Sequence, residues 1–225
     1  MDLADTASPW PGVYPALVTD VKDPDNQGRV KVTLPLAPDP GGARYEAWAR
    51  LATLMAGRNR GTWFVPEVDD EVLVAFEGGD PGLPFVIGAL WNGKDMPPQS
   101  MDGSGSNNLK SVVTRNGLVL EFNDNPGLEA LTLRTPGGNK LVLKDGPGAV
   151  IIEDSNGNVV RLESHGIALL ASNNVRIDGS EVAINAGKIK LTAGTVECSN
   201  EIKGTTVNVK HVIAETYTPG SGNIW

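Results

Sequence analysis

Two histidines and one cysteine are the residues of this 225-residue chain that could most readily bind a transition metal or act as nucleophiles. His165 and His211 lie far apart, and neither begins a zinc-ligand spacing. We interpret His165 as a solvated residue at a corner formed with Gly166. His211 is the one axial metal candidate, because several copies of the chain around a common axis would bring their imidazoles together. Cys198 follows an apolar alternation and is interpreted as a core residue.

Four acidic residues form a cluster that could bind a cation or perform general acid/base chemistry. They are separated by at most one position, at Glu67, Asp69, Asp70 and Glu71. The cluster coincides with a predicted turn between two strands, so we interpret it as a solvated loop. We predict no metal ion and no cofactor for this chain.

Glu153, Asp154 and Glu163 could imitate the paired carboxylates of a glycoside-cleaving enzyme. They fall on corners of short repeats, in a stretch without the aromatic platforms that sugars require. The sequence also lacks a Ser-His-Asp arrangement, a phosphate-binding loop and a dinucleotide fingerprint. We therefore predict that the chain is not an enzyme. A carbohydrate-cleaving β-helical tailspike is kept as the enzymatic alternative.

Charge and hydropathy exclude two further classes of function. The chain has 27 acidic and 19 basic residues and a formal net charge of −8. This balance disfavours a phosphate-binding surface, so no nucleic-acid partner is predicted. The longest apolar runs are too short to cross a bilayer, and the first residues lack the pattern of a signal peptide. We therefore predict neither a transmembrane segment nor a signal peptide.

Aromatic residues divide the chain into two parts. Nine of the twelve lie between Trp10 and Trp91, and there is none from Asn123 to Glu215. A glycine- and serine-rich stretch begins at Asp102 and reads as a connector. The predicted organisation is a leader (1–11), a collar domain (12–102), a linker and lead-in segment (103–117), a needle (118–216) and a tip segment (217–225).

The collar domain shows short strands of period two separated by strong turns. The expected strands cover residues 14–21, 29–34, 47–51, 61–65, 71–76 and 84–90. No ten-residue helical period interrupts them. We therefore predict an all-β fold that begins with an OB-type barrel.

Ordered motifs of this region carry a resemblance to a known family. They are Gly28-Arg29-Val30-Lys31-Val32, Trp48-Ala49-Arg50, Gly61-Thr62-Trp63-Phe64-Val65-Pro66, Asp70 to Phe76, Gly79-Asp80-Pro81, Pro84 to Gly88 and Leu90 to Gly93, followed by Asn108 to Gly117 and Leu120 to Asp124. The series resembles the VgrG and phage baseplate assembly protein V family. These proteins are the central spikes of type VI secretion systems, contractile phage tails and related extracellular injection systems. The resemblance implies an OB collar that leads into a β-helical needle, here in a form without the N-terminal hub domains and without a lysozyme domain.

The second half repeats a short apolar-x-apolar unit. From Leu131 the first apolar residues follow one another at steps of 10, 9, 9, 8, 8, 7, 7 and 7 residues. Gly157, Gly166 and later glycines are expected at the corners. A unit of seven or eight residues supplies only one face of a β-helical coil, so one chain cannot enclose a core. We predict a homotrimer in which three chains form a triple-stranded intertwined β-helix, or β-prism needle.

The predicted homotrimeric needle has an apolar core shared by three chains and a tip at its C-terminal end. Core candidates are the apolar members of four successive repeats: Val175, Ile177, Val182, Ile184, Ile189, Leu191, Val196 and Cys198. Tip-docking candidates are Tyr217, Ile224 and Trp225.

The resemblance implies a structural spike that transmits sheath contraction to puncture a cell envelope. It also implies a component of a phage virion or injection-system particle that is assembled in the bacterial cytoplasm. Its expected partners are two further copies, a separate hub protein of the baseplate, a PAAR-type tip protein or effector cargo and, transiently, the target envelope. An OB-fold adaptor with a passive trimerisation stalk is the alternative from the class of binding proteins.

Overall fold

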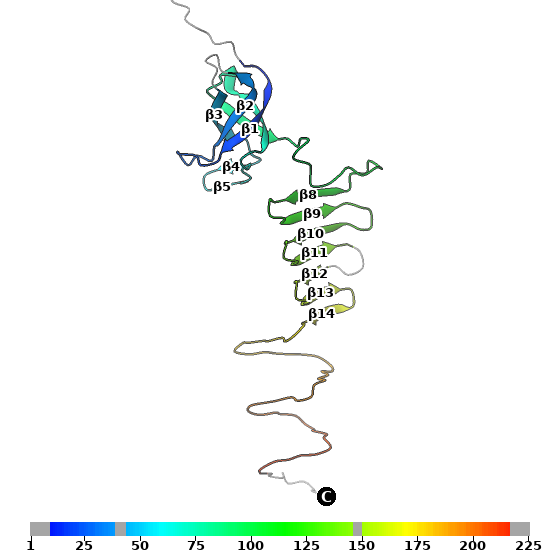
Figure 1. The fold of residues 1–225 in the computed structure, drawn as a ribbon. Coiled ribbons are helices and arrows are strands. Elements are labelled where there is room, and N and C mark those ends of the chain that lie inside the picture. The colour runs from blue at the N-terminus through cyan, green and yellow to red at the C-terminus, as the bar shows by residue number, and fades with distance from the viewer. Residues whose placement is uncertain (1–9, 39–43, 146–149, 217–225) are drawn as a thin grey trace, which may run out of the picture. The chain divides into compact units, whose positions relative to one another are not determined.

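Nearly all regular structure in the described residues is β (Figure 1). The computed structural model describes residues 10–38, 44–145 and 150–216. Within these ranges there is one short helical turn, η1 (Glu77–Gly79). None of the described helical residues forms a segment long and apolar enough to cross a membrane.

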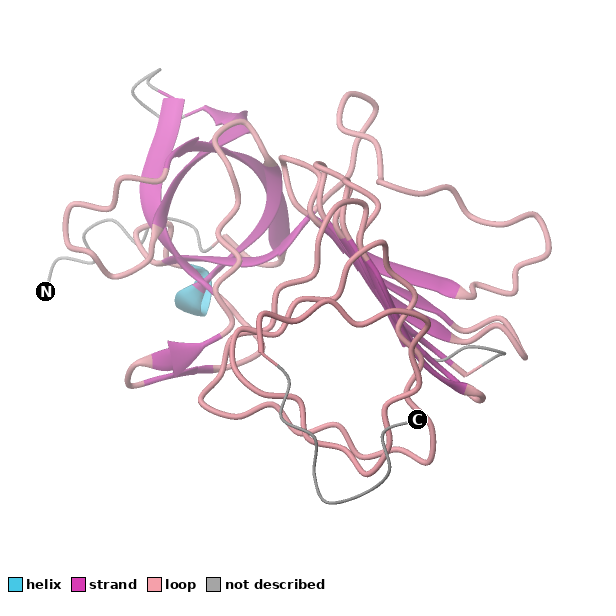
Figure 2. Ribbon diagram, turned by 90° about the horizontal axis from the view of Figure 1, so that it is seen from below, coloured by secondary structure: helices cyan, strands magenta, loops and turns pink. Residues whose placement is uncertain are grey.

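Five strands close into a barrel in the N-terminal part (Figure 2). They are β1 (Val13–Asp20), β2 (Val30–Pro38), β3 (Arg44–Leu51), β6 (Glu71–Phe76) and β7 (Pro84–Ala89). The order around the barrel is β1-β2-β3-β7-β6, and β6 pairs with β1 to close it. All neighbours are antiparallel except β3 and β7. This arrangement confirms the prediction of an all-β fold with an OB-type barrel.

The barrel core follows the period-two pattern of the sequence. Along β6, Val72, Val74 and Phe76 are buried and the residues between them are only partly covered. The other buried apolar residues come from every strand of the barrel: Ala16, Val18, Val30, Val32, Leu34, Ala49 and Val86. Small β-branched side chains dominate because a five-stranded barrel has a narrow interior.

Four aromatic rings pack together against this core. Phe76 makes edge contacts with Trp10, Tyr14 and Tyr45, with ring centroids 5.3–6.0 Å apart. The Tyr45 hydroxyl donates to the carbonyl of Pro81 at 2.6 Å. Burial, together with the nearby charge of Asp80, raises the pKa of Tyr45 to about 12. The hydroxyl therefore remains a donor across the whole physiological pH range.

The predicted strand at residues 61–65 is wrong. The structure has a two-residue hairpin here, β4 (Ala56–Gly57) and β5 (Arg60–Gly61), and no strand in 62–70. Trp63 and Phe64 are each about three-quarters exposed, so the apolar run has no core to pack on. Pro66 also removes a backbone donor that a barrel strand would need.

The loop between β1 and β2 is organised by Asp23. Its carboxylate accepts hydrogen bonds from the Arg29 guanidinium and from three backbone N–H groups, of Asp25, Gln27 and Arg29. The Arg29 side chain, more than any other contact, holds the pKa of Asp23 well below its usual range. The guanidinium also lies 5.8 Å from the Trp48 ring centroid. This loop is therefore fixed by Asp23, a residue that the sequence motifs did not single out.

Seven consecutive strands form a second sheet. They are β8 (Leu109–Val113), β9 (Val119–Asn123), β10 (Ala130–Arg134), β11 (Lys140–Lys144), β12 (Val150–Glu153), β13 (Val159–Glu163) and β14 (Gly166–Leu170). Each strand pairs antiparallel with the next in the sequence. The first five apolar repeats, from Leu131 to Leu169, all lie in these strands, as predicted. β8 falls within the range that was expected as a lead-in segment.

Three turns along one side of this sheet have the same construction. They begin at Thr114, Thr135 and Asp154 and each spans five residues. In each turn the first side chain accepts a hydrogen bond from the N–H of the fifth residue. The fourth residue is glycine with φ between +82° and +92°, a conformation that other residues rarely adopt. Gly157 was expected at a corner between repeats, and it lies in a turn that reverses the chain between the antiparallel strands β12 and β13.

Asp154 makes the third of these turns sensitive to acid. Hydrogen bonds from the side chain and backbone of Asn158 lower the pKa of Asp154 from 3.8 to about 2. A carboxyl group whose pKa is lower in the folded than in the unfolded chain stabilises the fold at every pH above the unfolded pKa. This stabilisation is lost as the pH falls from 3.8 to about 2. Because Thr114 and Thr135 occupy the same position, Asp154→Thr should keep the turn and remove this pH dependence. Amide exchange in residues 150–163 should therefore rise less on acidification in Asp154→Thr than in the wild type. An equal rise would contradict the assignment.

The chain divides into two units after Asn173. Residues 174–216 run as an extended segment that changes direction repeatedly (Figure 1). Within these residues the structure assigns no strand and no hydrogen bond between backbone groups. The sequence predicts that the repeats of this segment pair between chains, and that prediction is untested by a single chain.

Candidate self-association surface

One face of the β8–β14 sheet carries two columns of apolar side chains. Residues that are directly opposite on neighbouring strands, and every second residue along a strand, share a face. The registers therefore place two continuous rows on the same side. The first row is Lys110, Phe122, Leu131, Leu143, Val150, Leu162 and Ile167, and the second is Val112, Leu120, Leu133, Leu141, Ile152, Val160 and Leu169. We call this surface the apolar face.

The apolar face is uncovered to a large extent in the single chain. Leu133 and Leu143 are each 42% exposed and Ile152 is 50% exposed, although all three lie within the sheet. Lys110, the one polar member of the two columns, is on the terminal strand and pairs with Asp124 at 2.6 Å. Contiguous apolar surface of this kind marks an interaction site in a soluble protein.

The opposite face has a mixed character. Its central row is Ser111, Glu121, Thr132, Val142, Ile151, Arg161 and Ala168. A neighbouring row places Lys140 directly opposite Glu153. Three polar residues on β8–β10 are followed by Val142 and Ile151, and Val142 is only 7% exposed. The two faces therefore have different roles, and the apolar face is the candidate interface.

The predicted trimer-core residues all lie in the extended segment and are exposed there. Their exposed fractions run from 54% for Val175 and Val182 to 70% for Leu191. Cys198 is also exposed, and its thiol donates to the carbonyl of Glu201 at 3.5 Å. Their assignment to a core shared by three chains remains a proposal.

The residues of the apolar face were missing from the predicted core. The signal for them was present, because Leu131 to Leu169 contain five of the apolar repeats. The antiparallel pairing that aligns these repeats into columns was not predicted. Without this pairing, the repeats alone indicated core candidates only in the later, seven-residue units.

The structure brings no metal-binding cluster together among the described histidine, cysteine and acidic residues. His165 is 81% exposed and lies 3.2 Å from the carboxylate of Glu163. His211 is exposed in the extended segment. The tip-docking candidates Tyr217, Ile224 and Trp225 lie outside the described residues.

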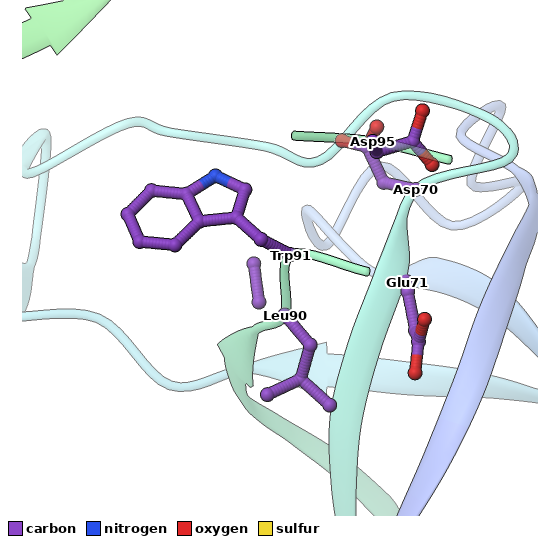
Figure 3. A pocket seen from close by; sticks show the side chains of 6 residues that line it. Asp70, Glu71, Leu90, Trp91 and Asp95 are labelled. Carbon is purple, nitrogen blue, oxygen red and sulfur yellow. The ribbon is translucent and has the colours of Figure 1, made fainter. Parts of the chain in front are cut away.

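The acidic cluster borders a pocket of about 240 Å³ at the ends of β6 and β7 (Figure 3). The figure shows Glu71 extending from β6, and Leu90 and Trp91 following β7. Two of the carboxylates organise loops: Glu71 accepts from the Asn92 amide at 2.7 Å, and Asp70 accepts from the backbone N–H of Glu67 at 2.8 Å. Glu67, Asp69 and Asp70 are exposed in the turn before β6, in line with the interpretation of the cluster as a solvated loop, and the contacts add that two of its carboxylates order this part of the chain.

Two regions of the chain match family descriptions. Residues 14–91 match the type VI secretion system/phage-baseplate injector OB domain. Residues 130–197 match the phage baseplate V C-terminal trimerisation domain. The first range covers the barrel, and the second covers β10–β14 together with the first half of the extended segment. Barrel and sheet thus define a baseplate-type injector protein.

Curated relatives agree with this class. The type VI secretion system spike protein VgrG1a of Pseudomonas aeruginosa is 29% identical over 44% of this chain and 16% of its own length. The spike protein VgrG3 of Vibrio cholerae is 28% identical over 63% of this chain and 13% of its own length. The actin cross-linking toxin VgrG1 of Vibrio cholerae is 24% identical over 76% and 15%, respectively. The chain therefore spans only about a seventh of these relatives.

The chain belongs to the VgrG and phage baseplate V family of spike proteins. The sequence resemblance to this family is confirmed by both matches.

Proposed function

We propose that three copies of the chain form the central spike of a contractile injection machine. The spike transmits the force of sheath contraction to a narrow point that punctures the target envelope. The observation that carries this proposal is the exposed apolar face, five of whose seven strands, β10–β14, lie within the range matched by a trimerisation domain. Membership of a spike family supports the mechanical role.

Three copies would cover the apolar face, since each chain contributes one sheet to a three-sided prism. The same threefold arrangement would place Val175 to Cys198 inside the needle, where strands of the neighbouring chains would satisfy their backbone groups. Closed arrangements of this kind leave no lateral strand edges. Such a needle resists bending and unfolding under axial load, which is what a puncturing device requires.

We propose that the barrels dock on a separate hub protein and that the C-terminal end carries a PAAR-type tip protein or an effector cargo. The acidic collar, with 15 acidic and 8 basic residues in positions 1–106, favours a partner surface of positive charge. The proposed role needs no catalytic chemistry. A carbohydrate-cleaving tailspike would release glycan fragments with turnover, whereas a spike would not.

The mass in solution tests the assembly directly. The expected value by light scattering is three times the chain mass of 23.7 kDa, or about 71 kDa. Purified injection particles should contain the chain in multiples of three. A stable monomer at micromolar concentration would overturn the architecture. A trimer that never associates with tail or hub proteins would favour the passive adaptor.

A further inference from the structure

We propose that the β8–β14 sheet is the nucleus that aligns three copies of the chain, and that residues 174–216 form strands only after these sheets have associated. The inference rests on the proposed homotrimer and deepens it. It assigns different tasks to the two parts of the trimerisation region: the sheet sets the register, and the extended segment depends on it.

Hydrogen bonding differs sharply between the two parts. Each of the seven strands is paired with its neighbour inside one chain, and four- or five-residue registers hold every pair. In residues 174–216, by contrast, the described hydrogen bonds are local and involve side chains, as between Arg176 and Asp178. The sheet can therefore fold before any second copy arrives, whereas the backbone groups of the extended segment are exposed to water and have no strand of their own chain to pair with among the described residues.

The boundary between the paired strands and the unpaired extended segment lies at residues 172 and 173. Ser172 donates from both its backbone N–H and its hydroxyl to the side-chain oxygen of Asn158, at 3.0 and 3.3 Å. The next residue ends the first unit. The step between apolar repeats is 8 to 10 residues before this point and 7 soon after it. The shorter step leaves fewer residues for a strand and a turn, and the structure assigns no strand within residues 174–216.

The sheet also carries enough surface for association without the extended segment. The apolar columns run across all seven strands, and many of their side chains, Leu133 and Leu143 among them, are more than a third exposed. Contact between three such faces would remove this apolar area from water. All seven strands of each sheet are in contact only when the three sheets are level, so this contact also favours one axial position of each chain relative to the others.

Ordering entropy makes this sequence of events necessary. Fixing the backbone of one residue costs roughly 1–2 kcal/mol, and the extended segment gains no hydrogen bonds of its own in return. Free chains would have to order three such segments at once. Chains already joined at their sheets hold the segments at an effective concentration on the order of millimolar, so the strands can add layer by layer.

Two lysine substitutions with matched controls test the inference in the full-length chain. Leu133→Lys places a charge on the apolar face, and Thr132→Lys places it on the opposite face of the same strand. Ile184→Lys alters a predicted core position of the extended segment, and Ala183→Lys alters the adjacent position. The readouts are the mass by light scattering and the amide exchange of three regions: the barrel, residues 109–170 and residues 174–216.

We expect Leu133→Lys to yield monomers in which residues 174–216 exchange about tenfold faster or more, while the barrel is unchanged. Ile184→Lys should remain trimeric, with protection lost only in the extended segment. Both controls should behave as wild type. If Ile184→Lys is monomeric while Leu133→Lys is trimeric, the inference is wrong although the trimer stands. If the wild type is monomeric, the proposed function itself fails.

Refolding of the wild type gives a second test that depends on no substitution. In pulsed amide labelling, residues 109–170 should become protected before residues 174–216, and the delay of the second phase should lengthen as the chain is diluted. Simultaneous protection, or earlier protection of the extended segment, contradicts the proposal.

Discussion

Aspartate in place of Val74 is expected to unfold the barrel. Val74 has no exposed surface, and it lies opposite Tyr14 on β1 and Val86 on β7, where the barrel closes. A carboxylate there has no partner among the apolar core residues. An unpaired buried charge costs on the order of 4 kcal/mol or more, comparable to the whole stability of a small domain.

Tryptophan fluorescence should report this loss, because four of the five tryptophans lie between residues 10 and 91. Val13→Asp is the matched control, since Val13 is 53% exposed at the start of β1. It should retain the wild-type unfolding transition.

The Val74→Asp variant also tests the proposed domain boundary near residue 103. The strands of the β8–β14 sheet pair only with one another among the described residues. Amide protection in residues 109–170 should therefore survive in Val74→Asp. Loss of protection in both regions would show that barrel and sheet fold as one unit.

Alanine in place of Phe76 is expected to cost about 3–5 kcal/mol of barrel stability, because a large ring is removed from a packed site. The ring is 8% exposed and contacts Trp10, Tyr14 and Tyr45. Urea unfolding followed by fluorescence measures the change. Phe64→Ala is the matched control: its ring is 75% exposed, and the expected change is within about 0.5 kcal/mol.

Phe76→Leu separates the volume of the ring from its edge contacts. Leucine keeps much of the apolar volume but loses three aromatic pairs, so its stability should fall between wild type and Phe76→Ala. Equal stability of Phe76→Ala and Phe64→Ala would contradict the proposed packing of the four rings.

Most barrel strands could be predicted because each carries a clear alternation between core and solvent. Arg29 to Leu34 and Glu71 to Phe76 are examples, and both are strands of the closed barrel. The run from Gly61 to Val65 has the same apolar content and forms no barrel strand. Whether Trp63 and Phe64 pack inward depends on where the other strands lie, and a local sequence pattern carries no information on that.

The candidate interface was only partly predictable for a related reason. Period two determines which residues of one strand share a face, so the repeats from Leu131 to Leu169 indicated apolar stripes correctly. Strand direction depends on the turns. The turns that begin at Thr114, Thr135 and Asp154 reverse the chain through a side-chain hydrogen bond and a glycine of positive φ.

The sequence by itself determined the β class, the family resemblance and the alternation that separates apolar from polar side chains. These properties are local, since they arise from residue types and their spacing along one strand. The tertiary structure decided which strands are neighbours, and hence that the repeats up to Leu170 form a sheet within one chain while residues 174–216 have no such pairing. Strand pairing depends on the turns and on hydrogen bonds between residues that are distant in the sequence. Backbone groups form these hydrogen bonds, and the pattern of side chains along one strand does not specify their partners.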